Sequence, residues 1–288
     1  MTTAQGIAAL PWRGRDEARP ALAVPPERMP LRMGGSWRKR WRYVGAFDER
    51  FMLCAAAAEI GPGRETFWAL WDREERALRE RTRHVVPLPF RPEVRFGECT
   101  VSVRSREFEI QLELGAGEEV ECACPTERGA YTWTRKLAGI EARGTIRIDG
   151  REAKLAGRAV EDRSAGYHAR RTSWLWSAGV GESADGRPLA WNLVSGINDP
   201  PSSSERAIWV DGAPHEPGPV TFDGLDAIRF DDGSALSFEP EAARARTEGF
   251  PLVYRSDYEA PFGSFAGSLG GIELARGTGV MERHDALW

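Results

Sequence analysis

The segment DRSAGYHARRTSWLWSAG, residues 162 to 179, combines a carboxylate, a phenol, an imidazole, two adjacent arginines and two closely spaced tryptophans. Asp162 and His168 are candidate catalytic residues, because one group that gives a proton and another that takes one suffice for cofactor-free proton transfer. Burial against indole rings would raise the pKa of the carboxyl group. Tyr167 and Arg171 are candidate ligand contacts in the same turn-prone segment. The alternative is that Asp162 caps a turn and His168 is a surface residue.

The C-terminal segment GTGVMERHDALW offers a second pair of titratable groups. On a strand that starts at Gly279, Glu282 and His284 share one face, since side chains alternate along a strand. They are therefore candidate catalytic residues as an acid and base pair. A metal site would need a third ligand from elsewhere, so we expect no metal and no cofactor.

Tryptophans predict an aromatic wall beside these groups. On a strand over residues 173–180, Trp174 and Trp176 share one face. After the turn at Asp185-Gly186, the segment PLAWNLVSG places Trp191 on one face and Asn192 on the other. A barrel interior with such faces forms an aromatic ligand pocket when its own side chains do not fill it. The alternative is that these tryptophans are core residues.

Two further segments are candidates for ligand binding. In YTWTRKLAG, one strand face carries Tyr131, Trp133 and Arg135. Two aromatic rings and a guanidinium group suit the polar or carboxylated end of a ligand. The alternative is a cation–π pair in the core. The loop SGINDPPSSSER, residues 195–206, is long and rich in turn residues. Loops of this length often carry function, although a plain surface loop is an equal alternative.

Short alternating runs separated by turns predict antiparallel strands along most of the chain. TVSVRSREFEIQLELG keeps a strict period of two, and Asp149-Gly150, Asp185-Gly186 and Asp211-Gly212 are hairpin signals. ETFWALWDREERALRERTR could form a helix, but its aromatic block favours two strands around residues 72–75. No alternation of strand and crossover helix occurs. The fold class is therefore all-β, a sandwich or barrel.

The strand-rich region divides into two similar halves. Residues 1–30 are rich in proline, arginine and alanine and predict a disordered arm. We expect an N-terminal β domain over residues 31–155 and a C-terminal β domain over 156–288. No Pro/Gly linker separates them, so the halves should pack closely.

Composition excludes several classes of protein. The 288 residues carry a net charge of −4, and the basic run over residues 38–42 is not extended elsewhere, so we expect no nucleic-acid partner. Four irregularly spaced cysteines indicate reduced thiols. The first residues lack the apolar core of a signal peptide, and no apolar run approaches 18 residues. We therefore expect a cytoplasmic protein without a transmembrane segment.

Several of these motifs carry a family resemblance. The order Gly157, Asp162, Gly166, then Trp-x-Trp, a D-G hairpin and Trp-Asn, resembles the second half of the AttH-like group of tandem lipocalin-like proteins, which includes bacterial carotenoid (hydroxyneurosporene) hydratases. The segments KRWRYVGAFDERFMLCAAAAEIG, YTWTRKLAG, AWNLVSGINDPPSSSER and GVMERHDALW, with the opening segment, resemble a bacterial family of unknown function near that group. The resemblance implies two lipocalin-like (calycin-type) barrels in tandem, a hydrophobic pocket at or between them, and Asp162 with His168 as the residues that protonate a double bond and guide water.

Three functions remain open. The first is a cofactor-independent enzyme, a hydratase, isomerase or cyclase, that acts on a hydrophobic small molecule; such an enzyme would be a lyase or isomerase without a redox cofactor. The second is a non-catalytic lipocalin-type protein that binds a hydrophobic or lipid-like ligand. The third is a structural or interaction protein. The sequence leaves open the ligand, any turnover, the half that holds the pocket and the oligomeric state.

Overall fold

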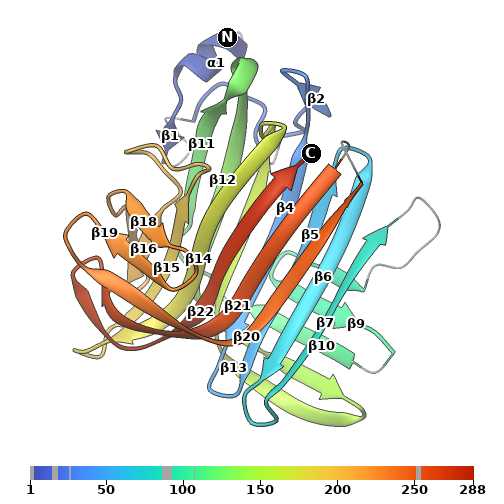
Figure 1. The fold of residues 1–288 in the computed structure, drawn as a ribbon, viewed down its shortest axis with the longest axis vertical. Helices are drawn as coiled ribbons and strands as arrows, with labels where there is room; N and C mark the ends of the chain where they lie inside the picture. Colours follow the sequence, from blue (N-terminus) through green and yellow to red (C-terminus); the bar gives the residue numbers. More distant parts are fainter. Residues whose placement is uncertain (1–2, 15–18, 26, 86–92, 107, 251–253) are drawn as a thin grey trace.

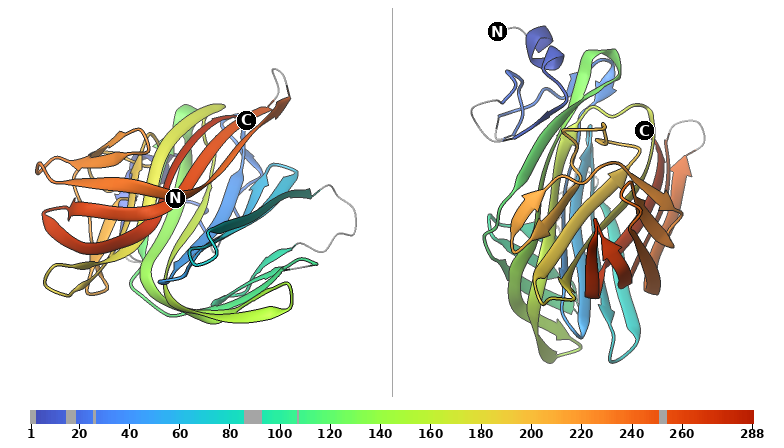
Figure 2. Two further views of the ribbon diagram at one scale, coloured as in Figure 1. Left: turned by 60° about the horizontal axis from the view of Figure 1, so that its bottom comes forward. Right: turned by 90° about the vertical axis from the view of Figure 1, so that its left-hand side faces the viewer.

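Antiparallel β-strands form most of the described part of the chain in the computed structural model, which describes residues 3–14, 19–25, 27–85, 93–106, 108–250 and 254–288 (Figure 1). The strands make two large curled sheets that lie side by side (Figure 2). The prediction of an all-β fold with two closely packed halves is confirmed.

The first sheet has the strand order β7-β6-β5-β4-β13-β12-β10-β9-β8, with β11 beside β12 and β1 beside β11. Its strands are β1 (Trp12–Arg13), β4 (Lys39–Phe47), β5 (Phe51–Ile60), β6 (Gly63–Asp72), β7 (Ala77–Val85), β8 (Val94–Phe96), β9 (Thr100–Arg104), β10 (Phe108–Leu114), β11 (Val120–Thr126), β12 (Ala130–Ile148) and β13 (Arg151–Gly166). Strands β6 and β7 show that the segment with helical composition forms two strands, as the aromatic block predicts.

The second sheet has the order β17-β16-β15-β14-β22-β21-β20-β19-β18. Its strands are β14 (Arg171–Ser183), β15 (Pro188–Ser195), β16 (Ala207–Val210), β17 (Ala213–His215), β18 (Val220–Asp223), β19 (Ala227–Phe230), β20 (Ala235–Phe250), β21 (Tyr254–Leu269) and β22 (Ile272–Leu287). In both sheets the first long strand pairs with the last strand, β4 with β13 and β14 with β22. The two halves are therefore built on the same plan.

Tight turns follow the glycine signals of the sequence. Asp149 and Gly150 both have positive φ between β12 and β13, and Asp211 and Gly212 have the same conformation between β16 and β17. A two-residue turn with two positive φ angles matches the twist of the flanking strands, which explains the Asp-Gly preference.

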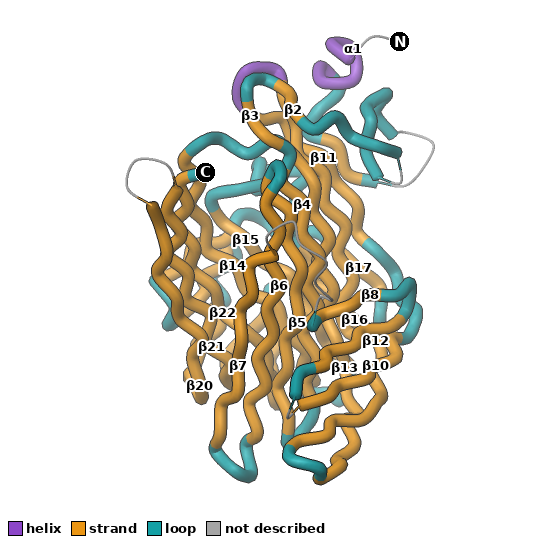
Figure 3. The backbone as a smooth tube through the Cα atoms, turned by 90° about the vertical axis from the view of Figure 1, so that its right-hand side faces the viewer, coloured by secondary structure: helices purple, strands orange, loops and turns teal. Residues whose placement is uncertain are grey.

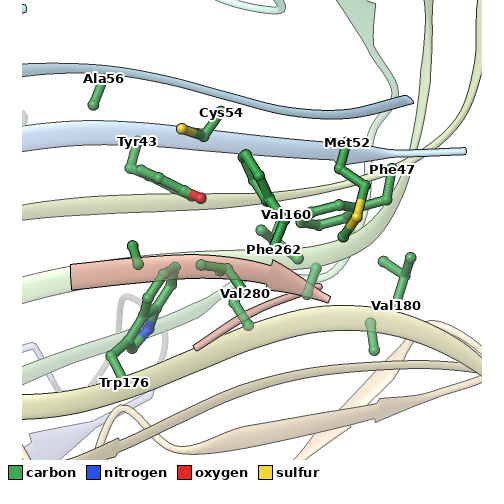
Figure 4. Close-up of a cluster of buried hydrophobic side chains, with 14 of the residues drawn as sticks. Tyr43, Phe47, Met52, Cys54, Ala56, Val160, Trp176, Val180, Phe262 and Val280 are labelled. Atoms are coloured by element: carbon green, nitrogen blue, oxygen red, sulfur yellow. The ribbon is translucent and has the colours of Figure 1, made fainter. Parts of the chain in front are cut away.

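The apolar side chains form a core within each sheet and a third core between the sheets. Strand β5 contributes to two of them, because Leu53 packs inside the first sheet and Met52 packs against the second. Figure 4 shows Tyr43 and Phe47 of the first sheet pointing toward Trp176 and Val280 of the second. The shared core fixes the two sheets relative to each other.

The described part of the first thirty residues differs from the predicted disordered arm. It contains helix α1 (Thr3–Ala8) and strand β1, and it lies at one end of the first sheet (Figure 3). Leu22, Val24 and Met29 are buried against Tyr131 and its neighbours. The sequence did not predict this burial, because the three apolar residues lie among prolines and polar residues. A two-stranded ribbon, β2 (Arg32–Met33) with β3 (Ser36–Trp37), follows, and η2 (Glu127–Gly129) is a short 3-10 turn.

The change of sheet also differs from the expected boundary at residues 155/156. That position falls inside β13, which pairs with β4 and β12 of the first sheet as far as Gly166. The second sheet begins at Arg171. The Asp149-Gly150 turn, near which the boundary was expected, is a hairpin within the first sheet and not a junction between halves.

Candidate functional site

A cleft opens between the two sheets above their shared core, and we call it the inter-sheet cleft. Both sheets line it, the first through β4, β5, β6, β12 and β13 and the second through β14, β15, β20, β21 and β22. Its cavity volume is about 130 Å³. Aromatic rings form much of its wall, namely Trp41, Tyr43, Phe67, Trp174, Trp176, Tyr254, Tyr258 and Trp288. The pocket therefore belongs to both halves and not to one barrel interior.

Two carboxylates in this cleft are each held by an indole. Trp41 Nε1 donates to Asp162 Oδ2 at 3.1 Å in the first sheet, and Trp174 Nε1 donates to Glu282 Oε1 at 2.7 Å in the second. The two indoles stack almost in parallel, with centroids 6.4 Å apart and planes 6° apart. The pairs thus meet face to face across the cleft.

The two pairs occupy equivalent places in the two sheets. Trp41 lies on β4 opposite Ser164 of β13, and Asp162 comes two residues before that partner. Trp174 lies on β14 opposite His284 of β22, and Glu282 again comes two residues before the partner. The shared plan of the halves therefore produces one tryptophan–carboxylate pair from each.

Asp162 also has a cation as partner. Lys136 Nζ lies 2.6 Å from Asp162 Oδ1 and 3.2 Å from Oε1 of Glu205, which comes from the long loop before β16. Burial lowers the pKa of Lys136, but the two carboxylates more than offset this and hold the pKa above its ordinary value. Asn198 Nδ2 donates to Glu205 Oε2 at 3.0 Å. A buried ammonium group therefore forms ion pairs with Asp162 and Glu205.

Among the described residues Glu282 has no salt-bridge partner, and the only cation that acts on its pKa is the more distant Arg244, which lowers it. Burial raises the pKa of Glu282 to about 7, although hydrogen bonds from Trp174 and Tyr258 favour its charged form, and the charge of Asp162 raises it further. The carboxyl group is consequently about half protonated near neutral pH. One cleft thus contains a carboxylate in an ion pair and a carboxyl group with a raised pKa.

Two histidines lie near this centre and both stay neutral. Burial lowers the pKa of His284 to about 4, and its Nε2 lies 2.8 Å from Ser256 Oγ in the cleft wall. Burial, with the charges of two lysines, lowers the pKa of His168 to about 3. His168 stacks on Trp41 at 5.2 Å but is not among the residues that line the cleft.

Comparison with known proteins places the chain in a family. The family model described as "Domain of unknown function (DUF2804)" matches residues 91–288, more than half of the chain. The chain belongs to this family. No curated protein matches it.

Solved structures share the fold of this DUF2804 protein at low sequence identity. Kievitone hydratase from Nectria haematococca is 10% identical with a TM-score of 0.52, and the match covers 85% of this chain and 88% of that one. A protein described as AttH from Nitrosomonas europaea is 14% identical with a TM-score of 0.48, covering 91% and 98%. CghA is 10% identical with a TM-score of 0.44, covering 87% and 88%. The predicted family and the tandem lipocalin-like fold are confirmed.

Five of the residues that the sequence singled out line the cleft, and a sixth lies behind its wall. Asp162, Glu282 and His284 line it together with Trp174 and Trp176, and Asn192 lies directly behind, where its Oδ1 accepts a hydrogen bond from Trp176 Nε1 at 2.8 Å. The chemical roles of these residues stay predictions. The loop 195–206 also belongs to the site, because it supplies Glu205 to the cleft.

Other candidates from the second half lie elsewhere. Trp191 is fully buried in the second sheet's own core, where its Nε1 donates to Ser177 Oγ at 3.0 Å. Arg171 is exposed and lies 3.7 Å from Asp285. The sequence could not show which face of β15 points toward the cleft, because both faces are mainly apolar and both are buried.

The tyrosines and the YTWTRKLAG segment also differ from expectation. Tyr131 and Tyr167 are buried under the N-terminal segment, where their hydroxyls donate to backbone carbonyls. Trp133 and Arg135 line a separate groove on the outer face of the first sheet. The residue after Arg135, Lys136, faces the inter-sheet cleft instead.

Sequence reasoning missed the lysines of the site. The chain has 39 basic residues but only three lysines, and two of these, Lys39 and Lys136, are buried and line the cleft. The sequence feature that could have revealed them is the rarity of lysine in a chain whose other basic residues are nearly all arginine. Trp41, which stacks across the cleft, was hidden because its partner Trp174 is far away in the sequence.

Within the described ranges, one group of side chains has the composition of a metal site. Donor atoms of Glu65, His84 and Glu248 lie within 4.8 Å of one another at the rim of the cleft. Both ring nitrogens of His84 already contact a carboxylate, at 3.3 and 2.9 Å. No helix among the described residues is both long and apolar enough to cross a membrane.

Proposed function

We propose that this DUF2804 protein is a cofactor-independent enzyme that performs acid–base chemistry on a hydrophobic small molecule in the inter-sheet cleft. The observation that supports it is the pair of carboxyl groups on facing walls of one aromatic cleft, Asp162 in an ion pair with Lys136 and Glu282 with a pKa that burial raises to about 7. Neighbouring titratable groups whose environments separate their pKa values are typical of an acid and a base. The reaction class is that of a hydratase, isomerase or cyclase.

In the proposed mechanism Glu282 donates the proton. Its pKa of about 7 is close to the working pH, where a general acid is most effective. Asp162, held as an anion by Lys136, accepts a proton from the substrate or from an attacking water molecule. In a hydration, one carbon takes the proton of Glu282 and its neighbour takes the hydroxyl group, while Asp162 receives the remaining proton. Exchange with solvent then restores both groups.

Tyr43 supplies a further polar contact for this chemistry. Its hydroxyl is buried in the cleft wall and has no hydrogen-bond partner among the described residues. Buried hydroxyls without a partner are uncommon, since desolvation without a hydrogen bond costs about 1–3 kcal/mol. A bound substrate would supply that partner.

The test is to recover the natural ligand and follow its conversion. The protein purified from its own host is examined by native mass spectrometry for a bound hydrophobic compound, with Glu282→Gln and Asp162→Asn beside the wild type. Asp285→Asn is the matched control, because Asp285 is a half-exposed carboxylate on the same strand. We expect the wild type and the control to convert the compound and the two cleft variants to retain it unchanged.

Two results would contradict the proposal. A compound held unchanged by all four proteins would make the chain a carrier of lipocalin type, which needs only the aromatic walls. Conversion at the wild-type rate by both cleft variants would remove the two carboxyl groups from the mechanism.

A further inference from the structure

A second lysine lines the inter-sheet cleft in a different environment from Lys136. Lys39 begins β4 and shares a face with Trp41 and Tyr43, two and four residues further along the strand. Its relative exposure is only 2%. The ammonium group therefore lies at the cleft wall and out of bulk solvent.

The described contacts of Lys39 do not neutralise its charge. Its Nζ donates to the backbone carbonyl of His168 at 3.1 Å and lies 5.1 Å from the ring centroid of Trp288. Burial lowers the pKa of Lys39 to about 8, and no carboxylate of the described residues raises it again. An ammonium group has three N–H donors, so donors remain for another acceptor.

The other cations of the cleft are each paired with a carboxylate. Lys136 pairs with Asp162, and the arginines pair as Arg40 with Glu59, Arg244 with Glu80 and Arg246 with Glu248. Among the described cations that line the cleft, Lys39 alone lacks such a partner. Buried charges in proteins are normally paired, because leaving one unpaired is costly. The missing partner is therefore an anion that enters the cleft.

We propose that Lys39 binds the carboxylate of a mainly apolar ligand, so that the substrate class is an amphiphilic carboxylic acid. This inference depends on the proposed function in taking the cleft as the ligand site. A singly charged head group fits best, because one cation is unpaired while the acidic side chains of Glu65, Asp162, Glu205, Glu248 and Glu282 also line the cleft. A dianionic phosphate would keep one of its two charges without a cation, because the other described cations of the cleft are already paired with carboxylates.

The position of Lys39 also orients such a ligand. Side chains on one strand face repeat every two residues, about 7 Å apart. A carboxylate at Lys39 would direct the apolar body past Trp41 toward Tyr43, and Trp41 stacks on Trp174, which holds Glu282. The reacting atoms would then lie about 7–13 Å from the carboxylate, one or two such steps away.

The test uses two probes of equal chain length, decanoate and 1-decanol, measured by isothermal titration calorimetry near neutral pH. The variants are Lys39→Met, which removes the charge, Lys39→Arg, which retains it, and Lys154→Met, which alters the exposed lysine of β13 as a control. We expect the wild type, the arginine variant and the control to bind decanoate at least about 10-fold more tightly than decanol, as hydrogen bonds to a charged group provide. Lys39→Met should bind both probes with the affinity for decanol.

Several outcomes would overturn the inference. Equal affinities of the wild type for the two probes would do so without any variant, and would leave the cleft as a hydrophobic pocket. A preference for decanoate that survives in Lys39→Met would place the anion elsewhere. If the wild type bound neither probe, the cleft itself would be rejected as a hydrophobic site, and the proposed function with it. Unchanged decanol binding by Lys39→Met shows that this variant is folded.

Discussion

Replacement of Glu282 by glutamine should stabilise the protein, and the gain should depend on pH. Glu282 is buried in the cleft wall, and burial raises its pKa from 4.5 to about 7. One pKa unit corresponds to about 1.4 kcal/mol, so ionising this group in the folded protein costs about 3 kcal/mol more than in the unfolded chain. Glutamine keeps the shape and can still accept the hydrogen bond from Trp174, but it carries no charge.

The sign of the pH dependence follows from proton linkage. The folded protein binds the Glu282 proton more tightly than the unfolded chain, so the unfolding free energy of the wild type falls as pH rises from about 4.5 to about 7. The variant lacks this loss. We expect Glu282→Gln to match the wild type near pH 4.5 and to be more stable by about 3 kcal/mol at about pH 8.

Urea denaturation at a series of pH values measures this difference. All other groups titrate in both proteins, so their contributions cancel when the two unfolding free energies are subtracted. Asp285→Asn is the control, because it removes a half-exposed carboxylate from the same strand. A constant difference between Glu282→Gln and the wild type from about pH 5 to about pH 8 would refute the raised pKa and, with it, the role of Glu282 as proton donor.

Three further substitutions test the packing and charges around the cleft. Lys136→Met should lower the unfolding free energy in urea denaturation by about 3–5 kcal/mol, because it leaves buried carboxylates without their cation. The double variant Lys136→Met/Glu205→Gln should recover part of this loss. The control Lys154→Met should change the unfolding free energy of the wild type by less than about 0.5 kcal/mol. Trp191→Ala should cost about 3–5 kcal/mol by emptying the second sheet's core, yet leave decanol affinity unchanged in calorimetry, since Trp191 does not line the cleft. Tyr43→Phe should be neutral or stabilising by up to about 1 kcal/mol in thermal unfolding without ligand, and a clear loss would show that the hydroxyl already has a partner.

Local patterns of the sequence were sufficient to predict the strands and the residues that share a face. The alternation of side chains along a strand is a property of neighbouring residues, so it correctly grouped Glu282 with His284 and Trp174 with Trp176. The Asp-Gly turns were equally local, since both residues at Asp149-Gly150 adopt the positive φ that this turn requires.

The sequence could not show which face of a strand lines the cleft and which packs elsewhere. Strand β12 buries both faces over its first half, so the pattern could not show that Lys136 faces the cleft and Trp133 faces away. Strand β15 placed Trp191 in a core for the same reason. Each of these assignments depends on which sheet packs against which face, and that is decided by contacts between residues far apart in the chain.

The difference between the two tryptophan–carboxylate pairs explains how one plan can supply both an acid and a base. Each half provides an indole that donates to a carboxylate from the last strand of its sheet. In the first half β12 places Lys136 beside Asp162, whereas in the second half the hydroxyl of Tyr258 on β21, a neutral donor, contacts Glu282. An adjacent ammonium favours the anion and a neutral donor in a buried site does so far less. The neighbouring strand of each sheet therefore determines whether the carboxyl group meets an ammonium or a neutral hydroxyl, and the proposed roles of base and acid depend on that difference.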